Sequence, residues 1–132
     1  MTPEQVQIVR VTFAQAMERK LEVGRIFYDR LFTIAPDTRA LFKNDIEEQS
    51  RKLMDALALA IGSLRDTPAL VGMLQALAQR HVRYGVRDEH YDKVGEALLW
   101  TLEKAFGAAF TPDVRNAWAT LYGVVATTMR KA

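Results

Sequence analysis

The sequence predicts an all-α protein, and three observations point to this fold class. Apolar residues recur at helical spacing along six substantial segments, and threonine followed by proline marks three expected helix starts. No segment shows the sustained polar–apolar alternation typical of a strand, and neither Asn-Gly nor Asp-Gly occurs as a hairpin signal. We therefore expect helices alone, packed as one domain over residues 1–132.

Each expected helix has its own start or stop signal. The first begins at Thr2-Pro3, where Gln5 completes the spacing of a capping box, and the second ends before Pro36, which cannot continue a helix without strain. Later helices open at a repeated Thr-Pro pair or at a capping aspartate, Asp88. In chain order the expected helices cover residues 2–20, 22–35, 46–64, 67–84, 88–107 and 111–129, with a short helical turn over 36–42 and a polar loop over 43–48.

The composition narrows the class of protein. At 132 residues, with 49% hydrophobic and 26% charged residues, the chain can bury a stable core. Its net charge of +2 is too small by itself to indicate nucleic acid, and the absence of cysteine excludes disulfides, thiolate metal sites and cysteine nucleophiles. The N-terminus begins a helix rather than a signal peptide, and no apolar run is long enough to span a bilayer. We expect a cytoplasmic protein with no membrane partner.

His81 is the most informative residue of the chain. It follows Leu70, Leu74 and Leu77 at helical spacing, which places an imidazole on an otherwise apolar face. A buried polar group without a partner costs about 1–3 kcal/mol, so His81 must either hydrogen-bond, for example to a carbonyl, or bind a metal. The apolar stripe alone leaves both alternatives open, and a core histidine is the commoner of the two.

Several aromatic and polar residues also admit two interpretations when taken singly. Tyr28 has the spacing of a core residue with its hydroxyl at the edge, and Gln49 is typical of a solvated glutamine on the same helix face as Leu53. Phe42 alone indicates only core packing. Trp118 and Tyr122, four residues apart, indicate packing rather than chemistry.

Taken in order, these segments resemble the bacterial globins of the flavohaemoglobin lineage. The resemblance covers essentially the whole chain, and it depends on several short motifs in the right order and spacing rather than on any single one. The matching segments are residues 27–32, 36–42, 49–53, 80–86, 90–96 and 117–123. The resemblance implies a globin fold, a three-over-three helical sandwich that encloses one haem b (iron protoporphyrin IX).

The resemblance also implies roles for individual residues. His81 corresponds to the proximal ligand whose Nε2 binds iron, with its other nitrogen bonded to the carbonyl of Leu77. Tyr28 and Gln49 correspond to the distal pair that faces the gas ligand. The expected haem contacts are Phe42, Leu53, Tyr84, Val86, Tyr91 and Val94.

Five further positions have weaker or no assigned roles. Arg80 and Lys52 are expected partners of the haem propionates, although either could equally be a solvated charge. Gly24 corresponds to a small residue at a close helix crossing, with Ser50 as its partner. His90 corresponds to no known role, and we expect it to be exposed.

Function follows from the expected distal pair. The tyrosine hydroxyl would stabilise O2, with CO and NO as related ligands, and Gln49 would add an N–H donor or hold the hydroxyl through its carbonyl. With no distal histidine, we expect five-coordinate ferrous iron and tight O2 retention. The expected function is oxygen binding, oxygen transport or NO scavenging. We expect the protein to be a monomer or a weak dimer.

Three alternatives remain at this stage. The first is a nitric oxide dioxygenase served by a separate reductase, since we expect no flavin or nicotinamide module in the chain. The last helix also lacks the glutamate that this lineage pairs with its proximal histidine, which argues against strong peroxidase activity. The second is a sensor module. The third is a haem-free protein that binds nucleic acid through Arg80, Arg83, Arg87 and Lys93, although our expected partners include no nucleic acid.

Overall fold

The computed structural model describes residues 1–43 and 45–132, which contain helices and no strand. The all-α prediction is therefore confirmed over the described residues. Asn44, inside the expected polar loop, lies outside them. The elements are α1 (Pro3–Met17), α2 (Lys20–Ile34), η1 (Pro36–Leu41), α3 (Ile46–Gly62), α4 (Thr67–Tyr84), α5 (Asp88–Phe106), η2 (Gly107–Ala109) and α6 (Pro112–Arg130), where η denotes a 3₁₀-helix.

Helix starts follow the capping chemistry, with two corrections. Thr2 and Gln5 form the predicted capping box, with reciprocal bonds of 3.1 and 3.0 Å. The cap of α4 is Asp66 rather than the expected threonine, because its carboxylate accepts the backbone N–H of Ala69 at 3.1 Å. The predicted cap Asp88 is instead the first residue of α5. α3 begins at residue 46, as expected for the helix over 46–64, so the last three residues of the polar segment expected over 43–48 are helical.

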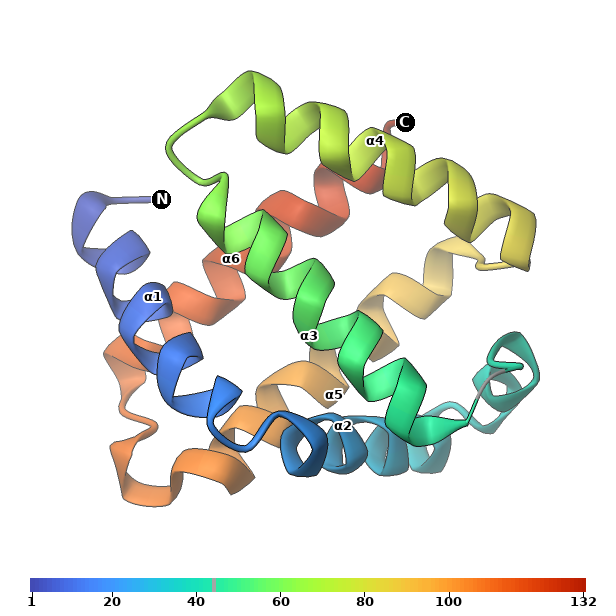
Figure 1. The fold of residues 1–132 in the computed structure, drawn as a ribbon, viewed down its shortest axis with the longest axis horizontal. Helices are drawn as coiled ribbons and strands as arrows, with labels where there is room; N and C mark the ends of the chain where they lie inside the picture. Colours follow the sequence, from blue (N-terminus) through green and yellow to red (C-terminus); the bar gives the residue numbers. More distant parts are fainter. Residues whose placement is uncertain (44) are drawn as a thin grey trace.

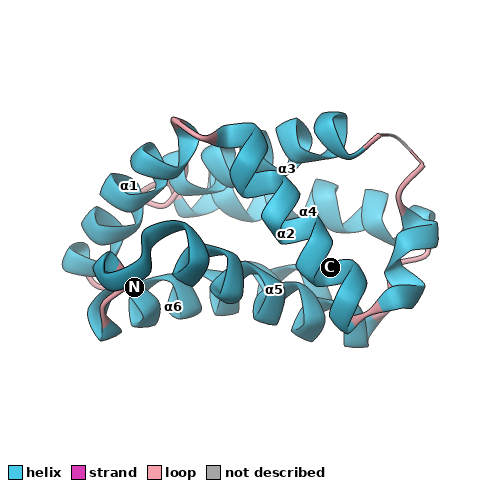
Figure 2. Ribbon diagram, turned by 90° about the horizontal axis from the view of Figure 1, so that it is seen from below, coloured by secondary structure: helices cyan, strands magenta, loops and turns pink. Residues whose placement is uncertain are grey.

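The helices form two layers. Figure 2 shows α1, α3 and α4 above α5 and α6, with α2 crossing in front of them. α2 packs against both α3 and α5, whereas α1 and α4 pack against α6. Figure 1 shows η1 at the opposite end of the molecule from α1. The sandwich therefore has α3 and α4 on one side and α5 and α6 on the other.

The crossing of α2 and α3 depends on Gly24. A Cβ atom at this position would lie 2.9 Å from the Cα of Ser50 and closer still to its side chain. Ser50 is fully buried, and its hydroxyl donates to the carbonyl of Ile46 at 2.7 Å, so it is satisfied within its own helix. The expected close contact of Gly24 with Ser50 is confirmed.

The buried side chains form two clusters. The larger one joins α1, α2, α3, α5 and α6 around Trp118, whose indole N–H donates to the hydroxyl of Thr12 at 2.9 Å. The smaller one joins α4 to the ends of α3 and α6 through Leu70, Leu74 and Met129. The helix that carries His81 therefore packs through its own apolar face. None of the helices in the described ranges is long and apolar enough to cross a membrane.

Candidate functional site

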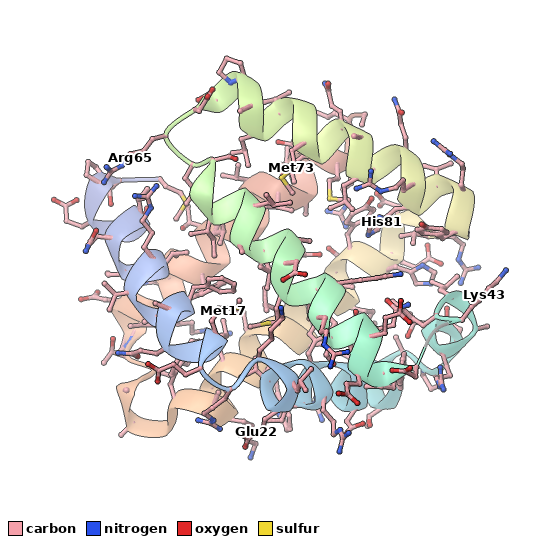
Figure 3. The ribbon with its side chains drawn as sticks, viewed as in Figure 1. Met17, Glu22, Lys43, Arg65, Met73 and His81 are labelled. Carbon is pink, nitrogen blue, oxygen red and sulfur yellow. The ribbon has the colours of Figure 1, made fainter. Side chains whose placement is uncertain are left out.

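His81 lies near the end of α4, and its side chain points from that helix toward the interior (Figure 3). Its Nδ1 lies 2.9 Å from the carbonyl oxygen of Leu77. Because a carbonyl can only accept, Nδ1 carries the proton and Nε2 keeps its lone pair. Burial lowers the pKa of His81, and the positive charge of Arg80 lowers it further, while the Leu77 carbonyl acts in the opposite direction. The site thus holds a neutral imidazole with Nε2 as the available ligand atom.

The chain leaves this helix through a glycine. Gly85 adopts a φ of +90°, a left-handed conformation that glycine tolerates best, and ends α4. The N–H of Val86 then donates to the carbonyl of His81 at 3.0 Å. The ring of Tyr84 is 6.5 Å from the His81 ring between centroids, but the residue is 62% exposed. A contact of Tyr84 with a bound group would therefore be at the surface.

Tyr28 lies on α2 and is only 4% exposed. Its hydroxyl donates to the backbone carbonyl of Gln49 at 3.3 Å, rather than to the side-chain amide considered from the sequence. Burial raises the pKa of Tyr28, so the hydroxyl remains a protonated donor at neutral pH. The hydrogen bond is long for an O–H···O contact, which leaves the hydroxyl weakly held.

Aromatic and aliphatic neighbours surround Tyr28. Its ring meets those of Phe27 and Phe42 edge to face, with centroids 4.9 and 5.1 Å apart. Leu53, one turn after Gln49 on α3, packs against the same cluster. The structure therefore brings the predicted residues Tyr28, Phe42, Gln49 and Leu53 into one group.

A second group of predicted residues lies around α4 and α5. Leu77 and Tyr91 pack against the smaller core cluster, and Val94 packs against the larger one. Tyr91 is held in place by Tyr122, whose hydroxyl donates to its backbone carbonyl, and its ring is covered by the guanidinium of Arg130 at 5.3 Å. The sequence had indicated only packing for Tyr122, and its role here is to position Tyr91.

The predicted cations are at the surface. Lys52 and Arg80 are both exposed, and Lys52 lies 3.8 Å from Glu48 on its own helix. Of the cations proposed for nucleic acid, Arg87 pairs with Asp37 and Glu89, and Lys93 pairs with Glu96. These ion pairs reduce the positive charge that a phosphate backbone would meet, which disfavours the nucleic-acid alternative.

His90 corrects the sequence-based expectation. We expected it to be exposed, but it is 4% exposed at the start of α5. Its Nδ1 accepts the backbone N–H of Arg87 at 2.9 Å, and its Nε2 lies 3.0 Å from the carboxylate of Asp37. A histidine can complete a capping box through Nδ1, and the three-residue spacing to Arg87 is the only signal in the sequence that could have indicated this burial.

The residues present fit a haem group. His81 offers one free imidazole nitrogen, while the residues described here include no cluster of three or more His, Asp or Glu that could hold a bare metal ion. A single imidazole suffices when a porphyrin supplies the remaining ligands. The apolar side chains expected to contact haem are only partly buried, so they keep surface that a flat apolar group would cover; these are Phe42, Leu53, Leu77, Val86 and Val94.

Comparisons with known proteins agree with this geometry. Residues 25–129 match the family model described as Globin. The flavohemoproteins of Bordetella pertussis, Bordetella parapertussis and Bordetella bronchiseptica are each 34% identical to the chain over 130 residues, which is 96% of this chain and 32% of each relative. The chain thus spans about a third of the length of the curated relatives it matches. The match over residues 25–129, the flavohemoprotein relatives and the two helical layers all agree. The chain therefore belongs to the globin family and has the all-α globin fold.

Proposed function

We propose that this chain is a haem b protein that reversibly binds O2, and also CO and NO, with His81 as its single protein ligand to iron. The observation that carries the proposal is the bond from His81 Nδ1 to the Leu77 carbonyl at 2.9 Å. This bond fixes the ring orientation and the tautomer, and it leaves a neutral Nε2 facing away from its own helix. Bound haem supplies the chemistry that no side chain has, which is reversible coordination of a diatomic gas.

Tyr28 and Gln49 are proposed to face the gas ligand. The buried Tyr28 hydroxyl is protonated and only weakly held by the Gln49 carbonyl, so it can turn toward a ligand that carries partial negative charge. The Gln49 side chain, which makes no bond to Tyr28 in the described residues, remains available as a second donor. A five-coordinate ferrous state with slow O2 release is expected.

The remaining proposed contacts divide by character. Apolar contact with the porphyrin would come from Phe42, Leu53, Val86 and Val94, and the propionates would meet the exposed cations Lys52 and Arg80. Tyr84 and Tyr91 would lie at the edge on the His81 side. Because Lys52 and Arg80 are exposed, loss of either cation should weaken haem binding less than loss of a partly buried apolar contact.

Absorption spectroscopy of the purified protein tests the proposal. The reduced protein should give a five-coordinate ferrous spectrum that changes on exposure to O2 and to CO. His81→Gly should abolish this spectrum and regain it with added imidazole, whereas Gln79→Ala, an exposed position on the same helix, should leave it unchanged. A six-coordinate ferrous spectrum without added ligand, or normal haem binding by His81→Gly without imidazole, would contradict it.

A second candidate is a nitric oxide dioxygenase that works with a separate reductase. The name of these relatives, flavohemoprotein, joins a flavin to a haem protein, which supports a flavin as the source of electrons. Tyr28 would then orient the O2 that reacts with NO. Catalytic NO consumption by the oxygenated protein with a reductase and NADH would support this function, whereas strictly stoichiometric consumption would restrict the protein to gas binding.

A further inference from the structure

A buried histidine outside the proposed haem ligands links two corners of the fold, the short helix η1 and the start of α5. His90, at the start of α5, has a side chain only 5% exposed, and its Nε2 lies 3.0 Å from an oxygen of Asp37 in η1. Since its Nδ1 accepts the backbone N–H of Arg87 at 2.9 Å, Nε2 carries the proton of the neutral ring and donates it to the carboxylate. Both nitrogens are therefore occupied, and His90 is available neither as a metal ligand nor as a base.

The two corners belong to opposite sides of the proposed haem site. η1 leads directly into Phe42, whose ring contacts Tyr28. The start of α5 follows the turn that leaves His81, and it leads into Tyr91. The link between Asp37 and His90 therefore joins the Tyr28 side to the His81 side at one edge of the molecule.

Two further contacts support this link. The guanidinium of Arg87, which is exposed, lies 3.0 Å from the same Asp37 oxygen. Leu41, the last residue of η1, reaches Gly85, where a Cβ atom would lie 3.6 Å from its Cδ2. The hydrogen bond from His90 holds the pKa of Asp37 below its usual range, so the carboxylate is charged at neutral pH.

We propose that the hydrogen bond between His90 and Asp37 is a latch that holds the two sides of the haem site together and so slows the release of haem. This proposal rests on haem binding as proposed above. Asp37 and His90 are positioning residues, since neither is assigned a contact with haem. Opening this edge separates η1 and Phe42 from the α4–α5 turn, and that motion exposes the apolar surfaces that would cover the porphyrin.

The chemistry of the latch predicts a graded series. Asp37→Ala leaves the buried N–H of His90 without an acceptor, whereas Asp37→Asn keeps a neutral amide oxygen that can accept it. A matched control exists at the far end of the molecule, where Thr12 accepts the N–H of the fully buried Trp118 at 2.9 Å. Thr12→Ala also removes the acceptor of a buried N–H, but it does so between α1 and α6.

The test measures haem transfer from the ferric holoprotein to an excess of a haem-free acceptor globin. We expect Asp37→Ala to lose haem about tenfold faster than the parent protein, Asp37→Asn by a smaller factor, and Thr12→Ala within about twofold despite lower resistance to urea. Equal rates of haem loss for Asp37→Ala and Thr12→Ala would overturn the proposal, because any orphaned N–H would then have the same effect.

Amide hydrogen exchange separates this proposal from that of haem binding. In the protein without haem, Asp37→Ala should speed exchange at the Arg87 amide and across residues 36–41, but not in α1. If the purified chain takes up no haem, the proposed function fails, and this exchange pattern alone decides whether the latch exists. Unchanged exchange at the Arg87 amide would overturn the latch even in a protein that binds haem.

Discussion

Tyr28→Phe is the most direct test of how the pocket would hold O2. The substitution removes one hydroxyl from a residue that is 4% exposed and leaves the ring contacts with Phe27 and Phe42 in place. It therefore isolates the hydrogen bond from the packing. The only partner that the hydroxyl loses among the described residues is the Gln49 carbonyl at 3.3 Å.

The expected magnitude is a difference between two hydrogen bonds. A bond from the hydroxyl to a partly charged O2 ligand contributes about 1.5–3 kcal/mol, whereas a neutral bond contributes about 0.5–1.5 kcal/mol. The resting bond is longer than the usual O–H···O distance of about 2.7–2.8 Å, so its contribution lies near the lower limit. The net stabilisation of O2 is then about 1–2.5 kcal/mol, which corresponds to an O2 release that is faster by about five- to seventyfold in the variant.

Stopped-flow displacement of O2 measures this rate, and CO provides the control. CO carries little negative charge, so its release should change by less than about threefold in the same variant. If O2 release is unchanged in Tyr28→Phe, the hydroxyl does not face the ligand. If O2 and CO release accelerate equally, the variant has altered the pocket rather than removed a hydrogen bond.

Two further predictions concern stability. Gly24→Ala should destabilise the fold by about 1–3 kcal/mol in urea unfolding, because the added methyl meets the backbone of Ser50. Gly72→Ala, where the added methyl meets open space, should instead stabilise its helix by about 0.5–1 kcal/mol. An unchanged free energy of unfolding in Gly24→Ala would contradict the close crossing. The pKa of Asp37 is lower in the folded protein than in the unfolded chain, where it is about 3.9. The charge of Asp37 therefore stabilises the fold above about pH 3.9, and this contribution is lost as the pH falls through the pKa of the folded protein. The stability difference between the parent protein and Asp37→Asn should therefore shrink below about pH 4 in circular dichroism titrations, and a difference that persists at lower pH would contradict the assignment.

The helices were predictable because their signals are local. Capping chemistry, proline and apolar spacing act within a few residues, so the ranges differ from the structure mainly at the ends. The N-cap of α4 shows the limit of such signals. Both Asp66 and Thr67 can cap a helix, and the sequence alone does not decide between neighbours that compete for the same N–H.

The bond from His81 to Leu77 was also predictable, because it spans one helical turn. The link between His90 and Asp37 was not, because it joins residues 53 apart in the chain. Its detection requires knowledge of how η1 meets α5. The same reason explains why the Tyr28 hydroxyl bonds to the backbone of Gln49 and not to its side chain, since the partner depends on the distance between two packed helices.

The surroundings of His81 predict little peroxidase activity. Its hydrogen-bond partner is a neutral carbonyl, and no carboxylate in the described ranges bonds to it. Asp88 and Asp92 lie on the same helix as Tyr91, and both are paired with Arg130, at 3.0 and 2.9 Å. The imidazole therefore remains neutral, and it lacks the anionic character that a bonded carboxylate would give it.

Asp92→Asn tests this interpretation, because it removes a negative charge on the Tyr91 side without touching His81. If the carboxylate polarises the imidazole, oxidation of a phenolic donor by hydrogen peroxide should fall about tenfold or more in the variant. We expect the rate to stay within about twofold of the parent protein, because Asp92 is exposed and its charge is already balanced by Arg130. A tenfold fall would mean that charge from α5 reaches the proximal ligand, and the neutral imidazole assigned to His81 would then be wrong.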